Sequence, residues 1–301
     1  IHADLGVALM TAERPDEGIE AFRRATKLKP RFAEAHYNLG RALAGRGDFD
    51  GAAKSLKTAV RQQPGHADAQ MNLGLVLASA GETKKSLPYL RKAVALMPGN
   101  VHALINLGTV LFEAEETDDA ARQFTRALDI DQDTAAAHFG LGHARETGGT
   151  RILMAAEQEE VAGHYRRALG LEPHYYEAHN NLGNILKSLH RLDDAERHYR
   201  QALEVRPSQL ETAANLAEVL IEQDRDDEAM DIFTTLRQSG LGPVYAGERI
   251  ARLMQEKGAF ESARDMIAEL RAIDPDLPAV FTLSAAERGH RVTLYEAQRQ
   301  L

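Results

Sequence analysis

Apolar residues recur along the chain at intervals of three and four, the spacing that places them on one face of an α-helix. One such stripe consists of Leu104, Leu107 and Leu111. A second helical segment follows each stripe, and a proline that cannot continue a helix, such as Pro64 or Pro98, ends most of these second segments. The pattern therefore predicts pairs of short helices joined by turns.

The helix pairs repeat with a period of 34 residues. Each of the first five predicted first helices contains a Leu-Gly dipeptide, and the glycines are Gly6, Gly40, Gly74, Gly108 and Gly142. We number the positions of one repeat as slots 1 to 34, with this glycine at slot 8. The predicted array spans residues 1–277 and divides into the repeats 1–32, 33–66, 67–100, 101–134, 135–175, 176–209, 210–243 and 244–277.

The repeat also determines where small and large side chains meet. Slot 8 is small, slot 20 is usually Ala, as at Ala120, and slot 24 holds a large residue such as Phe124 or Tyr199. Small residues let the two helices of a pair cross closely. Because one such hairpin cannot bury its apolar stripe alone, consecutive hairpins must stack on one another.

This pattern resembles the tetratricopeptide repeat, whose signature has Leu-Gly in the first helix and Ala, an aromatic residue, Ala and Pro in the second. The resemblance covers nearly the whole chain and implies an all-α fold, a right-handed α-solenoid of about eight helix hairpins. It also implies that slots 2, 5, 6, 9 and 13 of the first helices line a concave groove in which extended peptides bind. The sixth repeat is most similar to the repeat arm of O-linked N-acetylglucosamine transferases, through its segments 179–184 and 193–196.

Two segments depart from the pattern. The fifth repeat is seven residues longer than its neighbours, and we expect this insertion, within 145–160, to extend its second helix so that it begins near Arg151. A projection with a function of its own is the alternative. Residues 278–301 are expected to form a helix that caps the array, although Val292–Tyr295 has some strand character.

Slot 6 holds asparagine in five repeats, which accounts for most of the eight asparagines in the chain. These are Asn38, Asn72, Asn106, Asn181 and Asn215. Because a carboxamide both donates and accepts hydrogen bonds, a row of them can hold the backbone of a peptide whatever its side chains. The row resembles the asparagine ladder of the same transferases. The alternative is that this asparagine belongs to the general repeat consensus and binds no ligand.

Slots 5 and 9 add mostly apolar side chains to the same predicted face. Apart from Thr109 at slot 9 of the fourth repeat, those of the second to sixth repeats are predicted binding residues: Tyr37, Arg41, Met71, Leu75, Ile105, Phe139 and His143 in the second to fifth repeats, with Asn180 and Asn184 in the sixth. An apolar strip along a groove is typical of a surface that anchors a partner. The alternative is that neighbouring helices cover some of these side chains.

Charged side chains at the predicted groove favour some partners over others. No Lys stands at slot 5, so the carboxylate clamp of chaperone-binding family members is absent, which disfavours an acidic C-terminal tail as the ligand. Glu177, Glu211, Glu218 and Glu222 make the C-terminal half of the predicted groove acidic, which favours a basic peptide segment there.

Composition and net charge exclude or disfavour several kinds of site and partner. The chain has no Cys, which excludes disulfides, thiol nucleophiles and Cys-ligated metals within it. A net charge of −9 predicts no nucleic-acid partner, and no apolar run is long enough to insert into a membrane. Most of the twelve His fall at structural slots, so we expect no metal, no cofactor and no catalytic residue, and a cytoplasmic location.

The leading hypothesis is a non-catalytic scaffold that binds an extended peptide or partner segment in the concave groove. A second hypothesis is that the chain is the substrate-recruiting arm of a larger glycosyltransferase or sulfotransferase, because it begins at Ile1 within a helical pattern. A third is self-association through the uncapped first repeat.

Overall fold

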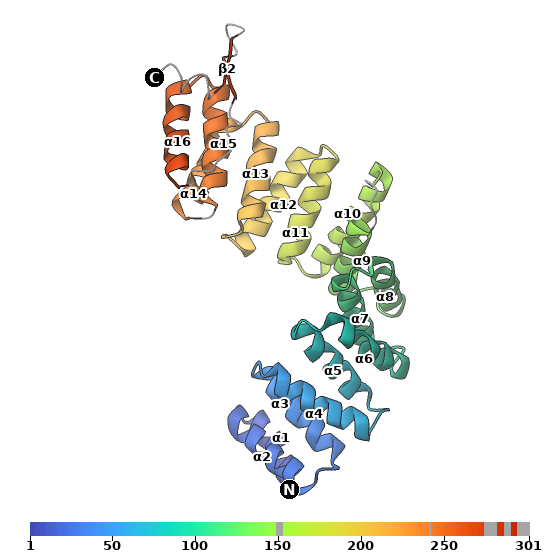
Figure 1. The fold of residues 1–301 in the computed structure, drawn as a ribbon. Coiled ribbons are helices and arrows are strands. Elements are labelled where there is room, and N and C mark those ends of the chain that lie inside the picture. The colour runs from blue at the N-terminus through green and yellow to red at the C-terminus, as the bar shows by residue number, and fades with distance from the viewer. Residues whose placement is uncertain (149–152, 241, 274–281, 286–289, 294–301) are drawn as a thin grey trace. The chain divides into compact units, whose positions relative to one another are not determined.

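The computed structural model describes residues 1–148, 153–240, 242–273, 282–285 and 290–293. These residues form sixteen α-helices and one two-stranded antiparallel hairpin (Figure 1). The chain divides into two compact units, unit 1 (Ile1–Leu171) and unit 2 (Glu172–Leu301). No helix within the described ranges is long and apolar enough to cross a membrane.

Unit 1 consists of alternating shorter and longer helices, which pair as consecutive hairpins. The helices are α1 (His2–Thr11), α2 (Pro15–Leu28), α3 (Ala33–Gly45), α4 (Phe49–Gln62), α5 (Ala67–Ser79), α6 (Thr83–Leu96), α7 (Val101–Glu113), α8 (Thr117–Ile130), α9 (Ala135–Thr147) and α10 (Ala155–Leu171). Unit 1 is therefore an α-solenoid of stacked helix hairpins, as the period predicts.

Unit 2 is also built from consecutive helix pairs and ends in the hairpin. Its elements are α11 (Tyr176–Ser188), α12 (Leu192–Val205), α13 (Leu210–Glu222), α14 (Asp226–Gln238), α15 (Pro243–Glu256), α16 (Phe260–Ile273), β1 (Thr282–Ala285) and β2 (His290–Thr293). Each odd-numbered helix packs against the even-numbered helix that follows it, so the solenoid architecture also holds in this unit.

The turn between the two helices of a pair uses a left-handed backbone residue at slot 15. Gly47 and Gly81 have φ of +79° and +78° there. Glu115 and His190 adopt the same conformation, with φ of +63° and +56°. A side chain in this conformation costs roughly 1–2 kcal/mol. The hairpin geometry is therefore kept even where glycine is not available.

In six of the eight pairs, the core forms where a slot-8 glycine of the first helix meets the slot-24 side chain of the second, and Ala217 and Ala251 stand at slot 8 in the last two pairs. A Cβ on Gly108 would lie 2.8 Å from Cε1 of Phe124, and a Cβ on Gly183 would lie 2.6 Å from Cε1 of Tyr199. Both rings are buried. Only glycine admits a ring at this distance, so the predicted close crossing of the two helices is confirmed.

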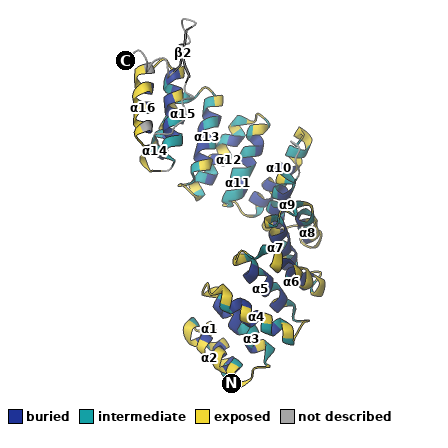
Figure 2. Ribbon diagram, viewed as in Figure 1, coloured by how far each residue is buried: buried dark blue, intermediate teal, exposed yellow. Residues whose placement is uncertain are grey.

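The first helices of the pairs form the inner side of each stack. In unit 1, α1 contacts α3, α3 contacts α5, α5 contacts α7 and α7 contacts α9, and in unit 2, α11 contacts α13. The second helices form the outer side. Figure 2 shows this difference in unit 1, where α5 and α7 are largely buried and α2 and α6 carry many exposed residues.

The prediction of a cap helix over residues 278–301 is wrong for Thr282–Ala285 and His290–Thr293, which form the strands β1 and β2. These segments pair as antiparallel strands, with Thr282 opposite Thr293 and Leu283 opposite Val292. The β-branched Thr and Val residues favour an extended backbone, which the weak helical pattern of this segment does not overcome. The remainder of 278–301 lies outside the described residues.

The insertion in the fifth repeat lies at the start of its second helix. Helix α10 has 17 residues, compared with 14 in α8. It begins at Ala155. The expected start near Arg151 lies outside the described residues.

Candidate functional site

Three asparagines of the predicted row lie on first helices of unit 1. Asn38, Asn72 and Asn106 stand at slot 6 of α3, α5 and α7, and each is half-buried. Nδ2 of Asn38 donates to Oε1 of Glu34 (3.3 Å), and Nδ2 of Asn72 donates to the backbone oxygen of Asp68 (2.8 Å). Asn106 makes no hydrogen bond to any residue that the structure describes. The row in unit 1 therefore retains capacity to bind a ligand backbone.

The asparagines of unit 2 bond to one another and to the neighbouring first helix. Nδ2 of Asn215 on α13 donates to Oδ1 of Asn184 on α11 (3.1 Å). The hydroxyl of Thr212 on α13 donates to Oδ1 of Asn180 (2.7 Å), whose Nδ2 donates to Oδ1 of Asn181 (3.3 Å). These carboxamides join α11 to α13, so part of their hydrogen-bonding capacity is used within the protein.

The aliphatic side chains at slots 5 and 9 of unit 1 are half-buried. Met71, Leu75 and Ile105 pack against the buried core formed by residues of α6 to α9. Neighbouring helices therefore cover these side chains in part and leave part of their surface exposed.

Two aromatic rings at slots 5 and 9 of α9 form a cluster with neighbouring helices. The rings of Phe139 and His143 stack with centroids 5.6 Å apart, and those of Phe112 and His143 are 4.6 Å apart. Nδ1 of His143 lies 3.8 Å from Oε2 of Glu146, which also accepts a hydrogen bond from the hydroxyl of Tyr165. The sequence reasoning missed Phe112 and Tyr165, because their contacts cross between helices.

A hollow of about 280 Å³ lies between α1, α2 and α3. Its lining residues are Val7, Met10, Thr11, Phe22, Asn38, Arg41 and Ala42. The guanidinium of Arg41 lies 5.6 Å from the ring centroid of Tyr37, and that ring lies 4.6 Å from the ring of His66. The hollow combines two predicted residues, Asn38 and Arg41, with apolar residues of α1 that the sequence reasoning missed.

The fifth repeat has glycine instead of asparagine at slot 6. A Cβ on Gly140 would lie 2.5 Å from both Cε1 and Cζ of Phe124. Any side chain at this position would overlap the ring, so the asparagine row is interrupted in α9 by packing.

The histidines at slot 4 have structural contacts. Nε2 of His36, His138 and His179 lies 3.0, 3.0 and 2.9 Å from the backbone oxygen of the residue at slot 32 of the preceding repeat. Nδ1 of His138 and His179 faces Nδ1 of His164 and His198, at 3.3 and 3.0 Å. Burial lowers the pKa of His164 to about 4 and also lowers the pKa of His179. Among the described residues, no group of three or more His, Asp or Glu could hold a metal ion.

Three of the carboxylates expected to make the C-terminal half of the groove acidic are paired within unit 2, and one of them is Glu222, whose Oε1 lies 3.9 Å from Nζ of Lys187. Oε2 of Glu218 lies 2.6 Å from Nζ of Lys187, and its Oε1 lies 3.5 Å from Nη2 of Arg249. Glu177 pairs with Arg206 at 2.7 Å. Cations of the same chain therefore offset part of the charge of these three carboxylates, and the preference for a basic peptide stays a prediction.

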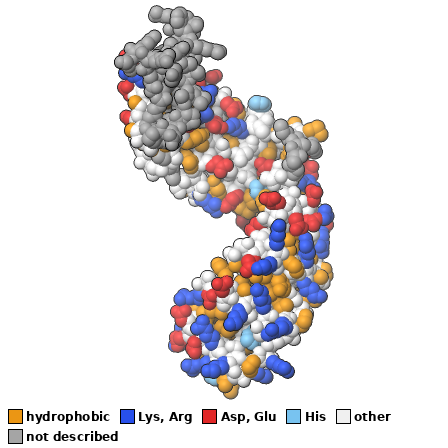
Figure 3. Space-filling view, in the orientation of Figure 1, with side chains coloured by type: hydrophobic (Ala, Val, Ile, Leu, Met, Phe, Trp, Pro, Cys, Tyr) orange, Lys and Arg blue, Asp and Glu red, His pale blue; other side chains and the backbone are white. Residues whose placement is uncertain are grey.

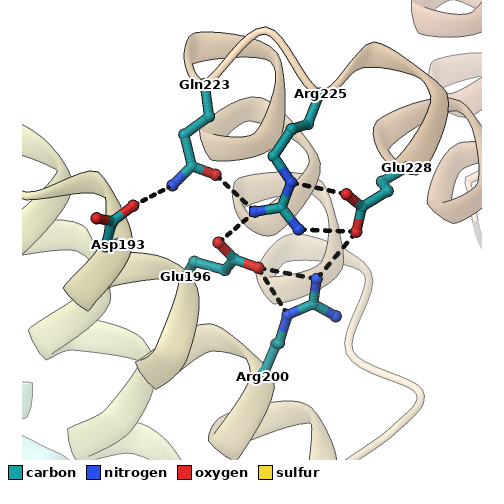
Figure 4. Close-up of polar contacts among 6 residues, drawn as sticks. All are labelled: Asp193, Glu196, Arg200, Gln223, Arg225 and Glu228. Carbon is teal, nitrogen blue, oxygen red and sulfur yellow. Dashed lines mark hydrogen bonds and ion pairs between the residues drawn. The ribbon is translucent and has the colours of Figure 1, made fainter.

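An ion-pair network joins α12 to the start of α14 in unit 2 (Figure 4). Arg225 donates to Oε2 of Glu196 (2.6 Å) and to Oε1 of Glu228 (2.7 Å). Arg200 lies 2.9 and 3.5 Å from the same two carboxylates. Burial alone would raise the pKa of Glu196, but the bonds from the two Arg side chains lower it. The network connects consecutive helix pairs and is structural.

Family models of the tetratricopeptide repeat match the chain in both units. They cover residues 3–54, 41–101 and 77–141 in unit 1 and residues 176–209 in unit 2. No curated protein matches the sequence significantly.

Several solved structures have a similar fold. PilF of Pseudomonas aeruginosa is 19% identical with a TM-score of 0.60, over 71% of this chain and 95% of the PilF chain. The Cut9–Hcn1 hetero-tetramer of the APC/C gives 20% identity and a TM-score of 0.59, over 73% of this chain and 42% of the other. YrrB, a tetratricopeptide repeat protein with an unusual peptide-binding site, gives 20% identity and a TM-score of 0.52, over 64% of this chain and 96% of YrrB. At these identities the likeness shows the fold alone.

Proposed function

This chain is a tetratricopeptide repeat protein, and on that premise we propose that it is a protein-interaction scaffold. The bound element is an extended segment of a partner protein. It lies along the inner face of unit 1, across α3, α5, α7 and α9.

The observation that carries this proposal is the unused hydrogen-bonding capacity of the asparagine row in unit 1. Asn106 is half-buried and makes no hydrogen bond to a described residue. Asn72 uses its Nδ2 in a bond to the backbone of its own helix, which leaves Oδ1 to accept. An extended peptide presents backbone N–H and C=O groups at regular intervals, and each carboxamide can bind one of either kind.

The side chains beside the row suit an apolar partner segment. Met71, Leu75 and Ile105 are half-buried on a packed core, so their positions are set before a ligand arrives. A preorganised surface of this kind loses little conformational entropy on binding. Side chains of the partner would add contact area here, while the asparagines hold its backbone.

The hollow beside α1 can receive one larger side chain of the partner. Val7 and Met10 supply an apolar wall, and Arg41 supplies a cation at its rim. Met10 and Val7 are 36% and 49% exposed, so both have surface to lose on binding. YrrB, one of the similar folds, has a peptide-binding site, which is consistent with this use of the fold.

A displayed library of random linear peptides, selected on the full chain, tests the proposal. We expect the selected peptides to lose about tenfold or more in affinity for Asn72→Ala/Asn106→Ala, because each lost hydrogen bond costs about 0.5–1.5 kcal/mol. The matched control is Gln63→Ala/Gln132→Ala, which removes two exposed carboxamides outside the inner face. Equal affinity for the wild type and the asparagine variant would overturn the proposed site.

A further inference from the structure

Positive charge is concentrated in one part of unit 1. Residues 21–98 contain fourteen Lys and Arg and only five Asp and Glu, a net charge of +9, whereas the whole chain has −9. Residues 99–171 of the same unit contain six Lys and Arg and twelve Asp and Glu. The cations therefore form a local surface on an acidic protein, which the net charge of the chain conceals.

Six of these cations, which we call the basic face, lie on the outer helices α2, α4 and α6. They are Arg23, Lys27, Lys54, Lys57, Arg61 and Lys92. All six are exposed, and none forms an ion pair with a residue in the described part of the chain. Figure 3 shows Lys and Arg side chains gathered over α4 and α6.

The repeat arranges the basic face in rows. Arg23 and Lys57 occupy the same slot of consecutive repeats, 34 residues apart, and so do Lys27 and Arg61. Equivalent slots of stacked repeats lie on the same side of the solenoid, so these cations follow one another from repeat to repeat.

Helix stability explains only part of the basic face. Lys27 and Arg61 lie in the last turns of α2 and α4, where a cation favours the helix dipole. Arg23, Lys54 and Lys57 lie nearer the middle of their helices, where the dipole gives no such benefit. Side-by-side cations repel one another, and of the six only Lys57 has an electrostatic interaction with a carboxylate among the described residues, that of Glu82. The surface is therefore suited to an anionic ligand.

A hollow of about 820 Å³ adjoins the basic face between α3, α4 and the loop that joins α2 to α3. Its lining residues are Pro30, Arg31, His36, Thr58, Arg61 and Gln62. Arg31 and Arg61 are both exposed at this hollow. A guanidinium binds a carboxylate through two parallel hydrogen bonds, so two of them at one hollow suit an Asp or Glu side chain.

We propose that the basic face of α2, α4 and α6 binds an acidic segment of a partner protein. Electrostatic interactions are screened beyond about 8 Å at physiological salt, so a short segment interacts with the basic face alone. A nucleic acid or an anionic membrane would also extend over the acidic residues 99–171 of the unit. Leu28 and Leu96, on α2 and α6, are 71% and 37% exposed and can contact apolar side chains of a protein segment.

Fluorescence anisotropy with the full chain and a short fluorescein-labelled peptide of alternating Glu and Leu tests this proposal. The test variant is Lys57→Glu/Arg61→Glu. The matched control is Arg122→Glu/Arg126→Glu, which makes the same change of charge at exposed positions on the outer helix α8. Lys57→Gln/Arg61→Gln removes the charges without reversing them. An oligo-dT strand and vesicles containing phosphatidylserine serve as the alternative ligands.

We expect the charge reversal to weaken peptide binding about tenfold or more, the Gln variant to weaken it less, and the control to leave it unchanged. Binding should also weaken as salt is raised. Equal binding by the charge-reversed and control variants would overturn the proposal, as would tighter binding of oligo-dT or of the vesicles. The basic face is on the outer helices, so a negative result in this experiment leaves the proposed binding site on the first helices unaffected. A negative result for that site likewise leaves the proposal for the basic face unaffected.

Discussion

The ring of Phe124 is held between two glycines, and this contact predicts the effect of a single methyl group. A Cβ on Gly140 would lie 2.5 Å from Cε1 and Cζ of the ring, and a Cβ on Gly108 would lie 2.8 Å from Cε1. Two carbon atoms in contact are normally about 3.5–4.0 Å apart. Phe124 is only 3% exposed, so the ring cannot turn out into solvent. In Gly140→Ala, the ring or helix α9 must therefore move by about 1 Å.

Two opposing effects determine how far Gly140→Ala changes the free energy of unfolding. Overpacking of this kind costs about 1–3 kcal/mol. Replacing glycine by alanine within a helix gains roughly 0.5–1 kcal/mol. Gly163 in α10 supplies the matched control, because a Cβ there would meet no atom within 4 Å. Gly163→Ala therefore gains the same helix propensity without the overlap, and the two variants should differ by about 1–3 kcal/mol.

Urea unfolding of the full chain, followed by circular dichroism, measures this difference. We expect Gly163→Ala to raise the midpoint and Gly140→Ala to lower it. The third repeat has Leu90 at the slot of Phe124, and the repeat that follows it has Asn106 at the slot of Gly140. A leucine at slot 24 is therefore compatible with a side chain at slot 6 of the next repeat. Phe124→Leu should therefore make Gly140→Ala tolerable. The reasoning is refuted if Gly140→Ala stabilises the protein as much as Gly163→Ala does.

Three further predictions concern polar contacts. Stability should fall as the pH falls from 6.5 towards 4, because burial keeps the pKa of His164 at about 4 while the same side chain in the unfolded chain takes up its proton near 6.5. In thermal melts, His164→Gln should make the melting temperature depend less on pH than in the wild type. An unchanged dependence on pH would contradict this prediction. Arg225→Gln breaks the ion pair to Glu196, so the melting temperature should fall, and by less at high salt; equal losses at both salt concentrations would argue against the network. Tyr199→Phe removes the hydroxyl that donates to Oδ1 of Asn184 (2.8 Å), which should cost about 0.5–1.5 kcal/mol in urea unfolding, and no loss would exclude a stabilising bond.

The packing of the helix pairs could be predicted from the sequence because the period aligns the residues that meet. Glycine at slot 8 and a large residue at slot 24 already specify the close crossing seen between Gly108 and Phe124. The left-handed turn residue could not be predicted from residue type, since Glu115 and His190 adopt it as Gly47 does. The terminal hairpin was also missed, because its strands are set by pairing between β1 and β2.

The positions of the asparagines could likewise be predicted, but their hydrogen bonds could not. Asn106 and Asn215 occupy the same slot, yet Asn215 donates to Asn184 of the preceding repeat and Asn106 makes no bond to a described residue. The difference depends on the residue that the preceding first helix offers. The ion pairs of the predicted acidic residues depend on neighbouring helices in the same way, because Glu218 on α13 pairs with Lys187 on α11.

Side-chain amide NMR during a titration with a selected peptide shows whether the asparagines of unit 1 contact the bound segment. We expect the carboxamide resonances of Asn72 and Asn106 to shift as the peptide binds, while that of Gln63, the residue that follows α4, stays in place. Unchanged Asn72 and Asn106 resonances in the presence of a bound peptide would place the ligand elsewhere and contradict the proposed binding site.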